Sequence, residues 1–131
     1  MYAILQREAG QVATQFLFNS RGKWIAFRSR PDDKFVFAPN GDWIGWLPWD
    51  EETVVDTKGK YLGTLFPNNR FYQLRMPRDR GRPGFPGAPG FPGRPGYPGF
   101  EGLAQLPVGT RDIPQEGRLV ERSASPRGVT F

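Results

Sequence analysis

Apolar and polar residues alternate in short blocks over the first half of the chain, and one block recurs three times. FLFNSRGKWIAF (16–27), FVFAPNGDWIGW (35–46) and TVVDTKGKYLGT (53–64) align without gaps. Each block has a short apolar run, four turn-forming residues, and then an aromatic, an aliphatic and a small residue. Recurrence at a near-constant interval indicates a repeated structural unit.

Each block predicts a β-hairpin with a turn that ends in glycine, at Gly22, Gly41 or Gly59. Asn or Asp at the first turn position, or Pro at the second, with Gly at the fourth is typical of a type I turn followed by a glycine bulge. Only glycine takes the left-handed conformation there without strain. We therefore expect the chain to reverse direction at each of these glycines.

The second strand of each block predicts which side chains meet. Residues 24–26, 43–45 and 61–63 each read aromatic, aliphatic, small. A period of two places the aromatic and small residues on one face and the aliphatic residue on the other. A small residue also leaves room for a neighbouring ring to cross the backbone. We expect the three rings to cluster around an axis of pseudo-symmetry.

Arg70–Leu74 predicts the first strand of a further unit, with Phe71 in the place of Phe35, although no turn glycine follows it. The N-terminal Tyr2–Leu5 is the predicted partner strand, because closure would remove the exposed sheet edges. The predicted fold class is all-β: a small closed or nearly closed array of pseudo-four-fold β-hairpins over residues 1–80, with a C-terminal Gly/Pro-rich extended tail.

The runs NSRGKWIAF and FAPNGDWIGWLPWDEETVVDTKGKYLGTLFPNNRFY, with the later GYPGFEGLAQLPVGTRDI, resemble the bacterial four-fold beta flower proteins. The resemblance covers roughly residues 15–113. It implies a small domain of pseudo-four-fold β-hairpins, followed in many members by a Pro-Gly-aromatic tail with a Leu-Pro-x-Gly segment. This chain has Phe where relatives often have Tyr, and it continues through ERSASPRGVTF. The resemblance implies no activity.

Glycine occupies every third position of the tail from Gly81 to Gly102, with six Gly-x-Pro triplets. That period fits a collagen triple helix, but six triplets are few and no trimerising unit is evident. A polyproline-type segment, a series of type II Pro-Gly turns, and packing on the chain's own domain or on a partner are the alternatives. Because such a composition buries little surface, we favour a disordered or partly extended tail over 81–102 and a mostly disordered segment over 103–131.

The composition argues against catalysis. The chain has no Cys and no His, which removes thiolate nucleophiles, the usual zinc ligands and the imidazole base. The carboxylates at 32–33 and 50–52 fall in loops between the repeats, where Asp serves local hydrogen bonding. We predict a non-enzyme without cofactor or metal.

The net charge of +5 is mixed with acids, whereas nucleic-acid proteins usually carry a sharper basic stripe. Nucleic acid is therefore disfavoured as a partner. No apolar run is long enough to span a membrane, and no export signal is visible at the N-terminus. We expect a cytoplasmic location.

Arginine and aromatic side chains of the tail are the candidate contacts for a protein partner or for self-association, including a homo-oligomer. With the loop residue Trp49, for which capping of the core is the favoured alternative, they are Trp49, Arg82, Phe85, Phe91, Arg94, Tyr97 and Phe100. The expected function is that of a structural or interaction protein, with a domain that folds without residues 81–131. Two alternatives stay open: glycan or small-ligand binding through Trp24, Trp43, Tyr61 and Trp49, and single-stranded nucleic-acid binding.

Overall fold

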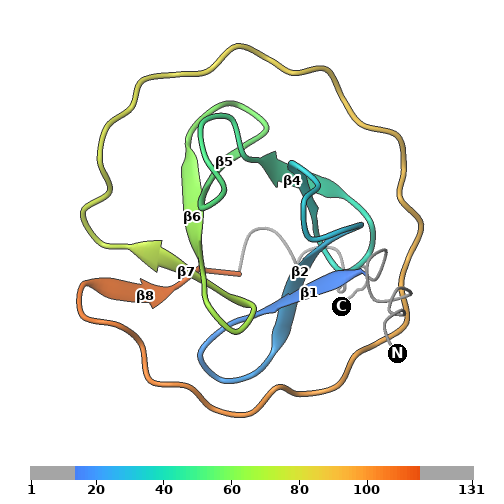
Figure 1. Cartoon of the computed structure of the whole chain (residues 1–131), viewed down its shortest axis with the longest axis vertical. Helices are drawn as coiled ribbons and strands as arrows, with labels where there is room; N and C mark the ends of the chain where they lie inside the picture. Colours follow the sequence, from blue (N-terminus) through green and yellow to red (C-terminus); the bar gives the residue numbers. More distant parts are fainter. Residues whose placement is uncertain (1–13, 116–131) are drawn as a thin grey trace, which may run out of the picture.

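The computed structural model describes residues 14–115, and within them the chain forms a single sheet and no helix (Figure 1). The strands are β1 (Gln15–Phe18), β2 (Trp24–Arg28), β3 (Phe35–Phe37), β4 (Trp43–Trp46), β5 (Thr53–Asp56), β6 (Tyr61–Phe66), β7 (Arg70–Leu74) and β8 (Thr110–Asp112). Strand order follows chain order, and β1 also pairs with β7, so seven strands close into a barrel with β8 added beside β7. The predicted all-β, closed array of hairpins is confirmed.

The three predicted hairpins are β1–β2, β3–β4 and β5–β6, each with the same turn. Gly22, Gly41 and Gly59 have φ angles of +81°, +93° and +88°. The N–H of each glycine donates to the carbonyl oxygen three residues earlier, at 2.8–3.0 Å. In the first and third hairpins the side chains of Asn19 and Asp56 each accept two backbone N–H groups of their own turn. The sequence prediction of glycine-ended turns is confirmed.

A β-bulge in each hairpin overturns the prediction that the rings gather on the axis. In the first hairpin Phe18 lies opposite Trp24 but Leu17 lies opposite Ala26, so Ile25 is an extra residue, and the other two hairpins repeat this shift. The bulge breaks the period of two. The small residue therefore faces the core with Leu17 or its equivalent, and the ring of Trp24 lies outside the core.

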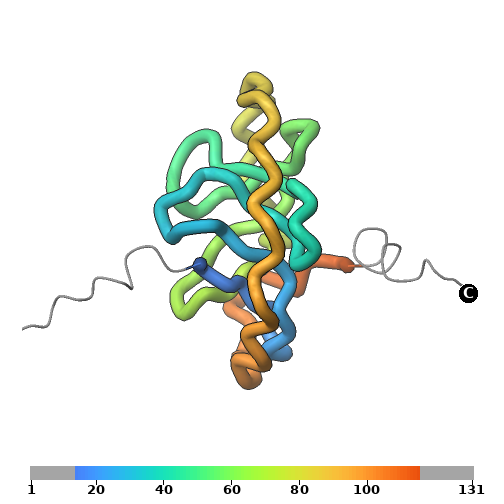
Figure 2. The backbone as a smooth tube through the Cα atoms, turned by 90° about the vertical axis from the view of Figure 1, so that its right-hand side faces the viewer, coloured from blue at the N-terminus to red at the C-terminus, as the bar shows by residue number. Residues whose placement is uncertain are grey.

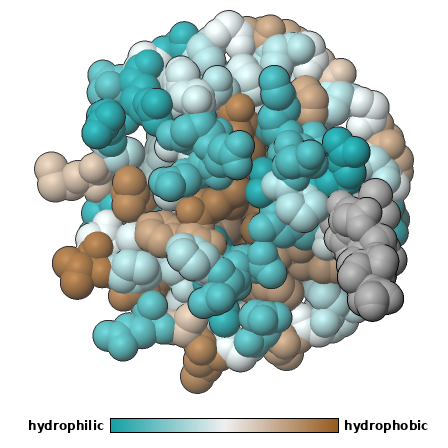
Figure 3. Space-filling model, viewed as in Figure 1, coloured by the Kyte–Doolittle hydropathy of each residue, from teal (hydrophilic) through white to brown (hydrophobic). Residues whose placement is uncertain are grey.

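The centre of the core is aliphatic apart from one phenylalanine, and other aromatic side chains such as Phe27 and Phe37 are buried as well. Eight side chains, two from each of four units and none more than 8% exposed, form its centre: Leu17, Ile25, Val36, Ile44, Val54, Leu62, Phe71 and Ile113. The small residues of the repeat allow these core side chains to pack against the strand backbone. A methyl group on Gly63 would lie only 2.7 Å from Cδ1 of Ile113 and 2.8 Å from Cε1 of Phe71. Apolar atoms are visible in the middle of the face in Figure 3.

The fourth unit consists of β7 and β8, which the sequence analysis did not connect. Residues 110–112, expected to lie in a mostly disordered segment, pair with residues 72–74. Thr64 pairs with Tyr72 as Trp46 pairs with Val55, so Phe71 occupies the place of Val54 and Val36, not that of Phe35 as predicted. The predicted partner Tyr2–Leu5 lies outside the described residues. The sheet therefore extends beyond residue 80.

The connection between β7 and β8, residues 75–109, passes once around the outside of the barrel (Figures 1 and 2). We call it the belt. It begins and ends as a hairpin connection does, because the N–H of Arg75 donates to the carbonyl oxygen of Gly109 at 2.8 Å. The Gly/Pro segment packs on its own domain, which was one of the alternatives; of the favoured disordered or partly extended tail, the disordered form is not found for residues 81–102.

Candidate functional site: the belt and its aromatic groups

The belt alternates between two kinds of Gly-x-Pro triplet. Its φ angles are positive at Gly81, Gly87, Gly93 and Gly99, but not at Gly84, Gly90 and Gly96. A Pro-Gly pair with positive φ at Gly fits a type II turn, so every second triplet turns and the others are extended. The collagen triple helix needs the same polyproline conformation at every residue. Both the extended and the turn alternatives thus contribute, and this conformation is not that of collagen.

The three turn glycines provide the surface on which the belt lies. A methyl group on Gly22 would lie 2.6 Å from the carbonyl oxygen of Gly102, and one on Gly41 would collide with the ring of Phe91. At Gly59 the belt is more distant, since an added methyl group would lie 3.5 Å from Cδ of Pro83. Glycine at these turns therefore adopts the positive φ without strain. At Gly22 and Gly41 the missing side chain also leaves room for the belt.

Belt rings contact an aromatic layer on the outside of the barrel. The ring centroid of Phe85 lies 5.8 Å from that of Trp43, and that of Tyr97 lies 6.1 Å from that of Trp24. Trp24 and Trp43 also contact Phe16 and Phe35 of their own hairpins. These two tryptophans are accordingly half-covered by the chain's own rings, which limits their use as a glycan-binding surface.

The belt is hydrogen-bonded to the barrel mainly near its end. The N–H of Glu101 donates to the carbonyl oxygen of Gly22 at 3.1 Å, and that of Ala104 donates to Ser20 at 2.8 Å. Arg70, only 9% exposed, donates from Nη1 to the carbonyl oxygens of Asn19 at 2.8 Å and Gly102 at 3.1 Å. One guanidinium group therefore binds the first turn and the belt together.

Arg70 and Asp112 were not singled out from the sequence. Asp112 of β8 accepts hydrogen bonds from both the N–H and the hydroxyl of Ser20 in the first turn. No sequence signal identified either residue, because their partners lie 31 or more positions away. Only closure of the barrel brings them into contact.

The predicted contact residues divide between solvent and the barrel. Phe85, Phe91, Tyr97 and Phe100 remain 67–74% exposed although three of them touch the barrel. Arg94 donates from Nε to the carbonyl oxygen of Asn40 at 3.1 Å. Arg82 lies beside Gly59. The structure therefore places these tail residues along a ring and keeps their rings at the surface.

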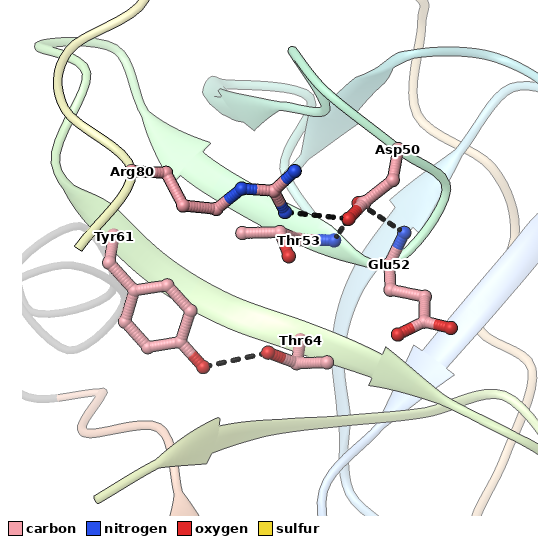
Figure 4. A network of polar contacts seen from close by, with 6 residues as sticks. All are labelled: Asp50, Glu52, Thr53, Tyr61, Thr64 and Arg80. Atoms are coloured by element: carbon pink, nitrogen blue, oxygen red, sulfur yellow. Dashed lines mark hydrogen bonds and ion pairs between the residues drawn. The ribbon is translucent and has the colours of Figure 1, made fainter. Parts of the chain in front are cut away.

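Trp49 packs against Arg80 of the belt and is exposed, whereas a residue that caps the core, the favoured expectation, would be buried. It is 36% exposed, and the guanidinium carbon of Arg80 lies 4.7 Å from its ring centroid. Arg80 also donates to Asp50 Oδ2 at 2.7 Å (Figure 4). Trp49 is thus part of a contact between the barrel and the belt.

Asp50 has a lowered pKa for reasons visible in Figure 4. Burial alone would raise the pKa of this carboxyl group, but hydrogen bonds from the Thr53 N–H, from Arg80 and from the Glu52 N–H outweigh it and lower the pKa to about 2. Its role is to hold its own loop and the first residues of the belt. Asp33 similarly accepts a hydrogen bond from the N–H of Phe35.

The chemical groups of the described part of the chain give little support for metal binding. Within residues 14–115 no three side chains of the Asp, Glu, His or Cys types gather where they could hold one ion. No helix of that range is long and apolar enough to cross a membrane.

Comparison with known proteins gives no match to a protein-family model, to a curated protein or to a solved structure.

Proposed function

We propose that this is a non-enzymatic structural or interaction protein whose belt makes contacts with other proteins, copies of itself included. The observation that carries the proposal is the distribution of exposed apolar side chains. Among the described residues, every exposed large apolar side chain except Trp49 lies on the belt: Met76, Phe85, Phe91, Tyr97, Phe100, Leu103 and Val108.

Apolar groups that project from an anchored backbone favour association. Large apolar surface is the main driving force of protein–protein contact, and a ligand segment already fixed in place loses less entropy on binding. The prolines 83, 86, 89, 92 and 95 are half-buried against the barrel, while the residues before them are exposed. The barrel is then a scaffold that presents a series of similar side chains around its circumference, a multivalent arrangement.

The four hairpin units, together with the sequence resemblance described above, support a place among the four-fold beta flower proteins. In this interpretation the fourth flower unit is the hairpin β7–β8, and the Pro-Gly-aromatic tail is its extended connection.

A variant that lacks two of the exposed belt rings tests the proposal. We expect the variant Phe91→Ser with Phe100→Ser to lose self-association, measured as particle mass by light scattering over a range of concentrations, and to capture fewer partner proteins in a pulldown. The control, Arg30→Ser with Lys58→Ser, removes two exposed long side chains outside the belt and should behave as the parent does. Equal particle mass and equal capture by the two variants would contradict the proposal.

Deletion of residues 81–131 is a poor test, contrary to our expectation from the sequence. It removes β8 and Ile113 of the core together with the belt. A loss of partner capture would then report the loss of the fourth hairpin as much as the loss of the rings.

A further inference from the structure

The pseudo-symmetry of the barrel leaves one ring of the outer layer without a belt ring. Trp24, Trp43 and Tyr61 hold the same position in three hairpins, opposite Phe18, Phe37 and Val55. Tyr97 covers the first and Phe85 covers the second. Tyr61 has no ring partner among the described residues; Met76, Pro77 and Arg78 at the start of the belt lie near it instead.

A cleft opens beside Tyr61, between this side chain and the first residues of the belt. Its volume is about 390 Å³, which is within the range of small-ligand sites. Tyr61 and Trp49 supply its aromatic walls, with Val55 between the polar groups. We call it the Tyr61 cleft.

The Tyr61 ring is held in place before any ligand arrives. Its hydroxyl group pairs with Thr64 Oγ1 at 2.8 Å (Figure 4). The same oxygen accepts the N–H of Leu74 at 2.8 Å. On the other wall, Arg80 lies over Trp49 and is fixed by Asp50. Rigid aromatic walls reduce the entropy lost when a flat molecule binds between them.

The rim of the Tyr61 cleft is cationic. Its lining includes one carboxylate, that of Asp79, and four cationic side chains: Lys60, Arg78, Arg80 and Arg82. Within residues 14–115 the charged groups of Lys60, Arg78 and Arg82 have no ion pair or hydrogen bond, whereas Arg80 is neutralised by Asp50. Three unpaired cations against the one carboxylate of Asp79 leave the rim with an excess of positive charge beside a ring, which favours an anion attached to an aromatic group.

We infer that the Tyr61 cleft binds a small aromatic phosphate, with its ring on Tyr61 in the place that Phe85 and Tyr97 take on the two tryptophans, and its phosphate among Lys60, Arg78 and Arg82. The chain's own belt indicates the ring half of the ligand, and the rim indicates the charged half. A nucleoside monophosphate and a phosphorylated tyrosine share this chemistry.

The full chain can be titrated with phenyl phosphate while binding is followed by calorimetry and by backbone amide shifts of Gly59, Lys60 and Arg78. We expect saturable binding, with inorganic phosphate and phenol each at least about tenfold weaker because each supplies half of the contacts. Adenosine monophosphate and O-phosphotyrosine then distinguish the two natural sources by their relative affinities.

Exposed cations provide the decisive variants. Lys60→Gln and Arg78→Gln should each weaken phenyl phosphate binding by about tenfold, as expected for loss of one charge-assisted contact. Arg75→Gln is the matched control, since Arg75 is exposed and does not line the cleft, and it should bind as the parent does. The inference is overturned if phenyl phosphate does not bind at 10 mM (roughly the weak limit of specific affinity), if inorganic phosphate binds as well, or if the three variants have equal affinity.

Discussion

The barrel and the belt belong to one chain but are ordered by different interactions. The barrel has paired strands throughout and a buried apolar core. The belt has no such pairing, and between its two ends Arg94 supplies a side-chain hydrogen bond to the barrel. A segment of this composition buries too little surface to order itself. Its order depends on the barrel, through two fixed ends and a row of glycine turns.

The largest effect should come from a change that breaks the barrel. Phe71 is 1% exposed and lies in the core of the fourth unit. Phe71→Ala should lower the free energy of unfolding by about 3–5 kcal/mol through lost burial and an added cavity, as measured by urea denaturation. Phe100→Ala, at a position 74% exposed, should change it by less than about 0.5 kcal/mol. Equal losses in the two variants would mean that the belt and the core contribute alike.

The second effect separates turn strain from belt contact. Gly22, Gly59 and Gly109 all have positive φ, so alanine at each should cost about 1–2 kcal/mol. At Gly22 the added methyl group also meets the backbone of Gly102, whereas at Gly109 nothing lies within 4 Å. Denaturation should therefore show Gly22→Ala to be the most damaging of the three, with Gly59→Ala and Gly109→Ala close together.

The corresponding contact at Gly41 involves a side chain and can be relieved. Gly41→Ala should cost less in a chain that also carries Phe91→Ala, because the ring that the methyl group meets is gone. Strictly additive losses would show that the belt does not press on this turn.

A third change should loosen the belt more than the barrel. Arg70→Met removes the guanidinium group that binds Asn19 and Gly102. We expect a loss of about 1–3 kcal/mol, and faster hydrogen exchange at the Glu101 and Ala104 amides than in the strands. Arg75→Met is the control for charge, since Arg75 is exposed. Uniformly faster exchange over the barrel and belt would show that the two do not separate.

The smallest effect is a pH dependence at the start of the belt. The pKa of Asp50 is about 2 in the folded chain against an ordinary 3.8, so its carboxylate stabilises the fold above about pH 4 and loses this effect as the pH falls toward 2. Because the side chain is 39% exposed, the contribution is discounted to about 1 kcal/mol or less. The stability difference between the parent and Asp50→Asn should shrink over this interval; a constant difference would contradict the assignment.

Local rules predicted the hairpins well and their faces poorly. The turn glycines follow from φ alone, and they appear at all three predicted positions. The predicted bulge was the glycine bulge of the turn, whereas a second bulge, in the strand that follows it, was not predicted: Ile25 and its equivalents become extra residues, so the aliphatic side chains enter the core and the rings of Trp24 and Trp43 face the belt. The alternation of side chains between the two faces of a strand cannot be extrapolated across a bulge, because the extra residue shifts it by one.

The candidate site was predictable by residue type and not by position. The exposed rings of the belt were identified from the sequence, but Tyr61 was indistinguishable from Trp24 and Trp43 until the belt was seen to cover only two of the three. Arg70 gave no sequence signal.

The sequence by itself determined the repeated hairpins, because a left-handed glycine and a short apolar run act over a few residues. The tertiary structure alone decided that the fourth hairpin closes across residues 75–109, and that a segment unable to order itself becomes a belt. The physical reason is distance along the chain: contacts such as that of Arg70 with Gly102 form only after the barrel has closed and placed their partners together.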